Sequence, residues 1–253
     1  MLQKERHNQI LAKLNLEGQV VVRNLAKDFQ VTEDCIRKDL TILEKEKKLK
    51  RVHGGATLIR KNVHIINSNE RLDLRLPEKK IIAQKAVNLI EPGSMIFLGI
   101  STVNLEIAKL IYQRDLKITV VTNMIDIMQI FRQDCLTRLI FLGGDYNQSR
   151  DGFLGTMTIE QIEKYKFDIA FLGVVGIDLH NDKVTTYEIN DGLTKKAVIH
   201  SSKKSYMVAE SVKLELDGNY VFASVSDFTG YICEKELTDN QKEFVFNYGI
   251  EIL

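Results

Sequence analysis

The sequence lacks several features that mark whole classes of protein. It has three cysteines, at positions 35, 135 and 233, an odd number without a CxxC pair, which argues against a metal site and fits a reducing compartment. Its longest strongly apolar run, residues 169–177, contains two glycines and is far shorter than the ~18 residues of a membrane span. The first ten residues contain no apolar stretch of a secretion signal. We therefore expect a cytoplasmic protein without a membrane partner.

Familiar catalytic and cofactor motifs are also absent. No GxGxxG opens a helix with an acid about 20 residues later, and there is no GxxxxGK[ST], HExxH or GxSxG segment. The five histidines are scattered along the chain. We therefore expect no dinucleotide, no metal, no other cofactor and no catalytic residues.

What the chain does have is a folded composition with an uneven charge distribution. At 253 residues it exceeds one ordinary domain, and 44% hydrophobic with 27% charged residues argues against disorder. Residues 1–61 hold fourteen lysines and arginines against eight acids, a net charge of +6, which leaves −5 on the rest. A basic N-terminal part on an acidic remainder is typical of nucleic-acid binding, although a solvated helix face gives a similar signal.

The basic part reads as three short helices followed by a hairpin. Apolar residues recur at helical spacing around residues 10–14 and again over 22–29. A third helix is predicted to begin at Thr32, a favoured N-cap, with two acids in its first turn. Residues 49–52 and 56–59 are expected to pair across a His-Gly-Gly turn, where glycine supplies a positive φ.

The third helix has an apolar stripe at positions 36, 40 and 43, which predicts that its other side faces outward. Two helices, a tight turn and a basic hairpin match a winged helix-turn-helix, in which the third helix enters the major groove and the hairpin reaches nearby phosphates. Arginine can bind guanine or phosphate with its fork, and a helix start attracts phosphate. The predicted DNA-binding residues are Thr32, Glu33, Cys35, Arg37, Lys38, Thr41, Arg51, His53 and Gly54. We expect Asp39, in contrast, to orient a neighbouring arginine.

The remainder alternates between strand-like and helical segments. Strands are predicted at 95–98, 118–122, 139–142, 169–174, 206–208 and 250–253. Helices are predicted at 78–90, 103–112, 125–131, 157–165, 190–201 and 240–248. This alternation predicts a mostly parallel sheet covered by helices, with ligands beyond the carboxyl ends of the strands. We expect a winged helix-turn-helix domain at 1–58, a linker at 59–77 and a larger α/β domain at 78–253.

The sequence resembles the DeoR family of bacterial transcription regulators over nearly its whole length. In the N-terminal part the resemblance is carried by ERHNQIL and by VRNLAKDFQVTEDCIRKDLTILEKEKKLKRVHGGA. In the larger part it is carried by EKKIIAQKAVNLIEPGSMIFL, ITVVTN, LIFLGGDYNQSRDGFLG, FDIAFLGVVGI, KKAVI and YMVAESVK. The family's sensor domain is similar to phosphosugar isomerases.

The resemblance implies a repressor of a sugar-metabolism operon that binds double-stranded operator DNA as a dimer or tetramer. It also implies a phosphorylated sugar as effector. Carried over to this chain, the effector-binding residues are Ser101, Thr102, Asn123, Gly144 and Lys213. The chain departs from the family pattern at Cys35, where a small polar residue is usual, and after the first strand of the sensor. There Gly99-Ile100-Ser101-Thr102-Val103 replaces Asp-Ser-Gly-Thr-Thr. The pocket has therefore either been retuned for an unusual effector or lost ligand binding.

Two other functions remain open from the sequence. One is a phosphosugar isomerase with an appended DNA-binding domain, which would need a carboxylate as general base. Asp145, Asp151 and Glu210 are the acids near the predicted pocket, and none lies on a recognisable catalytic motif. The other is an N-terminal domain that only docks a partner protein. We expect a regulator rather than an enzyme.

Overall fold

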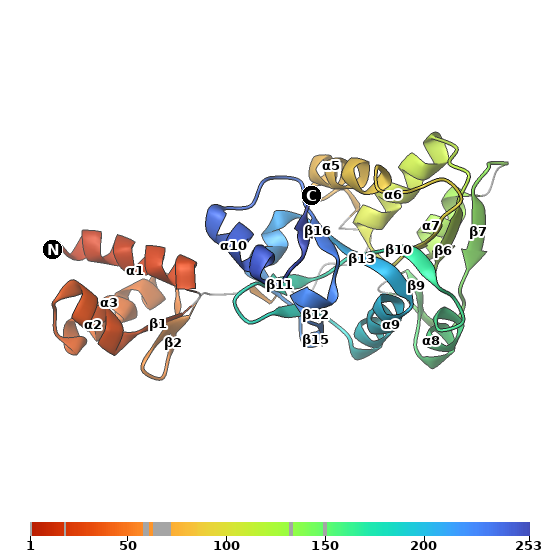
Figure 1. The fold of residues 1–253 in the computed structure, drawn as a ribbon. Coiled ribbons are helices and arrows are strands. Elements are labelled where there is room, and N and C mark those ends of the chain that lie inside the picture. The colour runs from red at the N-terminus through yellow and green to blue at the C-terminus, as the bar shows by residue number, and fades with distance from the viewer. Residues whose placement is uncertain (1, 18, 58–60, 63–71, 132–133, 149–150) are drawn as a thin grey trace. The chain divides into compact units, whose positions relative to one another are not determined.

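The structure is a computed structural model that describes residues 2–17, 19–57, 61–62, 72–131, 134–148 and 151–253. The chain divides into two compact units (Figure 1), Met1–Lys61, here called the head, and Asn62–Leu253, here called the body.

The head contains three helices and a small antiparallel sheet. The helices are α1 (Gln3–Glu17), α2 (Val22–Phe29) and α3 (Glu33–Lys45), and the strands are β1 (Gln19–Val21), β2 (Lys50–Val52) and β3 (Gly55–Thr57). The strand order is β1-β3-β2. Apolar residues at the predicted helical spacing form one core, including Ile10, Leu25, Ile36 and Leu40. Between α2 and α3, Gln30 adopts a left-handed conformation with φ 54°, which ends α2 and makes the helix-turn-helix connection.

Strand β1 is a feature of the head that the sequence pattern did not predict. Its three residues lie between two helices and pair with β3, with Val20 opposite Ala56. A strand this short has no readable alternation, so its pairing comes from the tertiary fold. The predicted hairpin is present as β2 and β3, but β3 covers 55–57 rather than 56–59, and residues 58–59 lie outside the described residues. Gly54 in the connecting turn has φ +78°, the positive value expected there.

The body is built on a seven-stranded sheet in which every pairing is parallel. In spatial order the strands are β17 (Glu251–Ile252), β16 (Gly230–Ile232), β13 (Ser202–Val208), β10 (Phe167–Leu172), β5 (Met95–Leu98), β6 (Thr119–Thr122) and β7 (Arg138–Phe141). The predicted fold class, a small winged helix-turn-helix domain with a larger α/β domain on a mostly parallel sheet, is confirmed.

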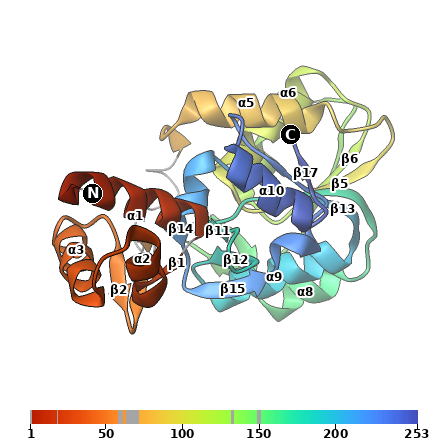
Figure 2. The ribbon, with the colours of Figure 1, turned by 60° about the vertical axis from the view of Figure 1, so that its left-hand side comes forward.

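Helices cover both faces of this sheet (Figures 1 and 2). One core cluster includes residues of α5 (Leu76–Val87), α6 (Thr102–Gln113) and α7 (Ile125–Ile130). The other includes residues of α8 (Thr156–Ile162), α9 (Ile189–His200) and α10 (Asp239–Asn247). Because the central strands are buried on both faces, they read in sequence as continuous apolar runs.

Shorter elements complete the fold. They are β4 (Lys61–Asn62), β8 (Asp145–Asn147), β9 (Gly152–Leu154), β11 (Gly176–Asp178), β12 (Lys183–Thr186), β14 (Leu216–Asp217), β15 (Tyr220–Ala223) and the 3₁₀ turns η1 (Ser211–Glu215) and η2 (Val225–Asp227). No helix in the described parts of the chain has both the length and the apolar character needed to cross a bilayer.

Sequence analysis missed several strands of the body and misplaced the start of one helix. The short strands β8, β9, β11, β12, β14 and β15 were not predicted. Strand β16 was missed because its three residues, Gly230–Ile232, are too few to form a distinct apolar run. Helix α5 begins at Leu76 rather than at residue 78, so Pro77 lies in its first turn instead of before it. Proline is tolerated there because the first helical N–H groups have no partner within the helix.

Candidate functional site

Helix α3 begins at a side-chain cap that the sequence predicted. Thr32 has an extended backbone, and its Oγ1 accepts a hydrogen bond from the Cys35 N–H at 3.2 Å. This contact satisfies one of the N–H groups that a helix start leaves unpaired. The Thr32 side chain therefore has a structural role in the head, in addition to the phosphate contact predicted for it.

The two sides of α3 separate as its spacing predicts. The apolar stripe is fully buried: Ile36, Leu40 and Leu43. Arg37 and Lys38 are exposed on the other side, and Cys35 and Thr41 are half-buried beside them. The helix therefore presents basic side chains to the solvent while its other face holds the core of the head.

Arg37 is engaged by two carboxylates of its own helix. Its Nη2 donates to Glu33 Oε2 at 2.6 Å and its Nη1 donates to Asp34 Oδ1 at 2.7 Å. All three side chains are substantially exposed, at 50%, 45% and 81%. Glu33, which its position at the helix start predicted to lie near a DNA phosphate, thus binds Arg37 in the DNA-free head.

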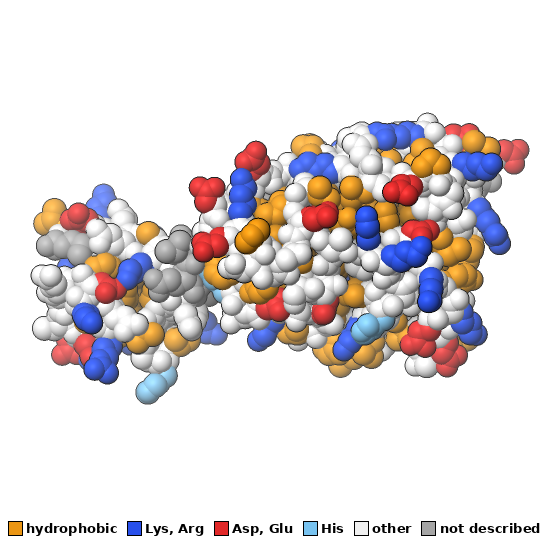
Figure 3. Space-filling view, viewed as in Figure 1, with side chains coloured by type: hydrophobic (Ala, Val, Ile, Leu, Met, Phe, Trp, Pro, Cys, Tyr) orange, Lys and Arg blue, Asp and Glu red, His pale blue; other side chains and the backbone are white. Residues whose placement is uncertain are grey.

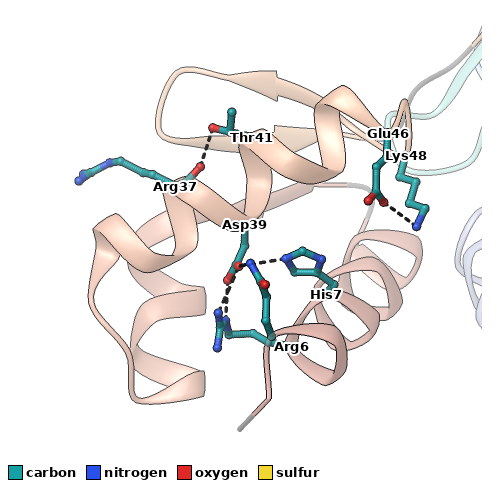
Figure 4. A network of polar contacts seen from close by, with 8 residues as sticks. Arg6, His7, Arg37, Asp39, Thr41, Glu46 and Lys48 are labelled. Atoms are coloured by element: carbon teal, nitrogen blue, oxygen red, sulfur yellow. Dashed lines mark hydrogen bonds and ion pairs between the residues drawn. The ribbon is translucent and has the colours of Figure 1, made fainter.

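Asp39 lies on the buried side of α3 and joins that helix to α1. Its side chain is 1% exposed and accepts hydrogen bonds from Arg6 Nε at 2.5 Å and Arg6 Nη2 at 3.1 Å. His7 Nε2 lies 2.9 Å from Asp39 Oδ1, and Gln3 Nε2 donates to the same oxygen at 3.3 Å. Figure 4 shows this cluster and the Arg37 side chain pointing away from it. As expected, Asp39 binds an arginine, although that arginine lies 33 residues earlier in the chain.

The cluster keeps the Asp39 carboxyl group charged. Burial alone would raise the pKa of Asp39, but the hydrogen bonds from Arg6, His7 and Gln3 outweigh it and lower that pKa below its usual value. The bond to Asp39 in turn raises the pKa of Arg6 above its ordinary value. This ionic contact fixes the position of α3 on α1, and so the direction in which Arg37 and Lys38 point.

The hairpin of β2 and β3, here called the wing, is connected to α3 by a chain of hydrogen bonds. Arg51 Nη1 on β2 donates to Thr41 Oγ1 at 2.9 Å, and the Thr41 hydroxyl donates to the Arg37 carbonyl at 2.8 Å. The Arg51 N–H also donates to Glu44 Oε1 at 2.9 Å. Three of the predicted DNA-binding residues, Arg37, Thr41 and Arg51, are thus linked directly, while His53 and Gly54 are exposed in the turn beyond.

The five predicted effector residues all follow carboxyl ends of parallel strands in the body. Ser101 and Thr102 follow β5, Asn123 follows β6, Gly144 follows β7 and Lys213 follows β13. Carboxyl ends of parallel strands lie at one edge of a sheet, where α/β proteins place their ligands. The sheet topology therefore brings these segments to the same edge.

The end of β5 is packed tightly against the end of β10. Ser101 caps α6, since its Oγ accepts from the Val103 N–H at 3.2 Å. A Cβ added at Gly173 would lie 2.4 Å from the Ser101 Cβ and 2.5 Å from its Oγ, so only glycine fits there. Thr102 is half-buried in the first turn of α6. The turn between β5 and α6 therefore lies in close contact with the end of β10.

Two buried asparagines at this edge have incompletely satisfied amide groups. Asn123 Nδ2 donates to the Phe153 carbonyl at 2.7 Å, and Asn104 Nδ2 donates to the carbonyls of Gly99 and Phe171, both at 2.8 Å. In the described part of the chain, neither side-chain oxygen has a donor. Asn104 was not predicted, because a lone asparagine inside an apolar helix carries no motif.

The other two predicted effector residues, Gly144 and Lys213, contact different elements. A side chain at Gly144, whose φ is +153°, would lie 2.1 Å from Thr158 Oγ1, so this glycine allows α8 to approach the sheet edge. Lys213 is half-buried in η1, which packs against β11. Its N–H donates to the carbonyl of Glu210 at 2.9 Å.

A buried ion pair in α9 was also missed by sequence analysis. Lys195 Nζ donates to Asp191 Oδ2 at 2.6 Å, and the Thr186 hydroxyl donates to the same oxygen. All three residues are buried, and Lys195 lies 5.7 Å from the centre of the Phe222 ring. The spacing of four residues between Asp191 and Lys195 is readable as a helical pair, but its burial is not.

Figure 3 shows acidic and basic side chains interspersed over the visible surface of the body. Among the described residues, no three histidine, cysteine, aspartate or glutamate side chains lie close enough together to hold a metal ion.

Two family models match the chain. Residues 6–62 match a DeoR-like helix-turn-helix domain, and residues 75–235 match a DeoR C-terminal sensor domain. The chain belongs to the DeoR family. The DeoR head and sensor matches correspond to the parts of the sequence that carried the resemblance.

Curated DeoR-type relatives match along most of their length. An uncharacterised HTH-type transcriptional regulator of Bacillus subtilis, YulB, is 33% identical over 94% of this chain and 91% of its own. The lactose phosphotransferase system repressor of Lactococcus lactis is 28% identical over 85% of this chain and 84% of its own. The glycerol-3-phosphate regulon repressor of Escherichia coli is 27% identical over 89% of this chain and 88% of its own. Among solved structures, ribose 5-phosphate isomerase A of Methanocaldococcus jannaschii matches 58% of the chain and 55% of its own at 18% identity, with a TM-score of 0.39.

Proposed function

We propose that this DeoR-family protein is a transcriptional repressor of a sugar-metabolism operon, and that a phosphorylated sugar controls its affinity for operator DNA. The observation that carries the proposal is the exposed face of α3, where Arg37 and Lys38 lie opposite the buried stripe and beside a wing linked to the helix. In a winged helix-turn-helix this face enters the major groove. Relatives named as repressors of lactose and glycerol-3-phosphate systems support the same function.

In this proposal eight of the nine DNA-binding residues predicted from the sequence contact DNA in two groups, and the ninth, Glu33, binds Arg37. Arg37 and Lys38 meet bases and phosphates in the groove, flanked by Thr32, Cys35 and Thr41. The wing contacts the backbone through Arg51, His53 and Gly54. Two half-sites about one helical turn apart require a two-fold oligomer, so that both heads bind together. We place the protein in the cytoplasm, where its DNA is.

The effector binds at the carboxyl edge of the body sheet. Ser101 and Thr102 at the start of α6 hold the phosphate, and Lys213 supplies a positive charge. Asn123, whose side-chain oxygen has no donor in the described part of the chain, can accept a hydrogen bond from a sugar hydroxyl. Linkage requires the sugar phosphate to bind the DNA-free state more tightly, typically by a coupling of about 1–3 kcal/mol.

The isomerase alternative is not favoured. The relatives reported above are named as regulators and repressors rather than as enzymes. Of the candidate bases, Asp151 accepts a hydrogen bond from the Asp126 N–H at 3.1 Å and so serves the start of α7. Turnover of a pentose or hexose phosphate by the full chain would reverse this ranking.

The test is to select bound duplexes from a random DNA pool, with and without a panel of pentose and hexose phosphates. We expect a selected site with two half-sites, and weakened binding with one of the phosphates but not with its unphosphorylated sugar. Lys213→Met should keep DNA affinity and lose the response to the phosphate. Lys204→Met, which removes an exposed lysine from the opposite end of β13, is the control. Failure of every duplex to bind would refute the proposal, and binding that no phosphate changes would refute its sensor half.

A further inference from the structure

The first turn of α3 carries two acids about one turn before the arginine proposed to read DNA. Glu33 is four residues and Asp34 three residues before Arg37, the two spacings at which helical side chains meet. The guanidinium fork of Arg37 binds both carboxylates, with N–O distances of 2.6 and 2.7 Å. In the DNA-free protein the guanidinium group of Arg37 is therefore already bound to two carboxylates.

The two lysines on the exposed face of α3 differ from Arg37 in their contacts. Lys38 and Lys45 are exposed and make no ion pair within the described residues. They are available to any phosphate. The sum of Glu33, Asp34 and Arg37 is one negative charge at the helix end where backbone N–H groups would otherwise attract phosphate. The head thus carries a net positive charge while the start of its α3 helix is locally acidic.

We propose that Glu33 and Asp34 are positioning residues that set the DNA specificity of Arg37. On a random duplex, the acids repel the phosphates and keep the guanidinium bound to themselves. On the operator, a guanine offers O6 and N7 to the same fork, and this bidentate contact replaces the two lost ion pairs. A lone phosphate contact does not require Arg37 and is made by Lys38. This inference rests on the proposed function, because it assumes that α3 reads operator DNA.

The two acids also have an ordinary structural effect, since acids in a first turn stabilise a helix through its dipole. That effect changes the stability of the head but not its preference between two duplexes. The ratio of affinities for operator and scrambled DNA, and the dependence of each affinity on salt, therefore separate a positioning role from a structural one.

The experiment measures binding of the full chain to the selected operator and to a scrambled duplex of the same length and composition, by fluorescence anisotropy at several salt concentrations. The variants are Glu33→Gln, Asp34→Asn and the double variant. Glu46→Gln is the matched control, because it removes one exposed, ion-paired carboxylate from the other end of α3 and changes the net charge equally. Thermal unfolding checks that each head is folded, and the single variants serve if the double variant is not.

We expect each substitution at Glu33 or Asp34 to strengthen binding to scrambled DNA about 2- to 5-fold, the scale of an exposed ion pair, and to lower the specificity ratio accordingly. Glu46→Gln should leave the ratio close to that of the wild type. In an Arg37→Ala background, the two acid substitutions should no longer change it.

The inference is overturned if the ratio is unchanged in the Glu33 and Asp34 variants, if Glu46→Gln lowers it equally, or if the effect persists without Arg37. These results would leave the proposed function standing, because the wild type would still select its operator. A wild-type chain that binds operator and scrambled DNA equally would instead refute the proposed function, and this inference with it.

Discussion

The head and the body present their candidate sites in opposite ways. The head builds its face from one short stretch of chain, α3 with the adjoining wing, and holds it in place with a buried ionic cluster around Asp39. The body gathers its candidate effector residues from the ends of strands spread over more than a hundred residues. A local site can be changed one side chain at a time, whereas the edge of a sheet depends on how the strands pack.

The largest expected effect is on the head. Asp39→Ala leaves the Arg6 guanidinium buried without its partner, which costs about 3–5 kcal/mol of unfolding free energy. Because the two units are separate compact bodies, the unfolding transition of the head should shift while that of the body stays. Calorimetry of the full chain measures both. Asp28→Ala, which breaks an exposed pair with Lys13, should cost no more than about 1 kcal/mol. Equal losses in the two variants would contradict the role given to the Asp39 cluster.

In the body, the corresponding prediction concerns the packing of two strand ends. Gly173→Ala places a Cβ against Ser101, and overpacking of this kind costs about 1–3 kcal/mol. Denaturant unfolding should show the loss in the body transition, together with a weaker response to the sugar phosphate. Gly143→Ala adds its Cβ into open space after β7, at the same edge of the sheet, and should be tolerated. A Gly173→Ala protein as stable as the Gly143→Ala protein would show that the β5 and β10 ends are not tightly packed.

Replacement of Arg37 tests the exposed face of α3 directly. Arg37→Ala should weaken operator binding by about 1–3 kcal/mol if the side chain reads a base, without changing the stability of the body. A gel-shift titration at fixed salt measures the loss. Lys13→Ala, on α1, removes one positive charge away from α3 and is the control. Unchanged operator affinity in the Arg37 variant would remove this residue from the DNA contacts.

Lowering the pH should destabilise the head and stabilise the body. These changes in unfolding free energy are the smallest of the expected effects. The pKa of Asp39 is lowered in the folded head, so its stabilisation is complete above about pH 3.9 and is lost as pH falls through the folded value. Burial and the neighbouring Asp151 carboxylate raise the pKa of Asp126 in the body, so charged Asp126 is destabilising and lowering the pH relieves it. Urea unfolding between pH 7 and pH 3 measures both transitions. Asp39→Asn and Asp126→Asn should each flatten one profile, and Asp126→Asn should stabilise the body at pH 7.

The same contrast explains what the sequence could predict. The helix-turn-helix, the exposed side of α3 and the Thr32 cap follow from local spacing and residue type, and the structure contains all three. The alternation of apolar runs likewise predicted the parallel sheet. The partner of Asp39 could not be predicted, because no local pattern links it to Arg6 33 residues away. Short strands such as β1 and β16 were missed because so few residues form a strand only when a neighbouring strand is present.

The body site was less predictable than the head for a physical reason. Its strand ends could be identified, but the contacts that fix them, such as Gly173 on Ser101 and Asn104 across two strand ends, join residues more than 60 positions apart. The roles of Glu33 and Asp34 lie between these cases. Their spacing from Arg37 is visible in the sequence, whereas the simultaneous engagement of both acids by one guanidinium is visible only in the structure.

The central claim is that Arg37, on the exposed face of α3, reads guanines in the major groove. Methylation interference at guanine N7 in the selected operator tests it most directly. We expect methylation to block the wild type at two clusters of guanines about one helical turn apart, and Arg37→Ala to lose sensitivity to one guanine in each cluster. Wild-type binding that is indifferent to N7 methylation at every guanine would contradict the claim.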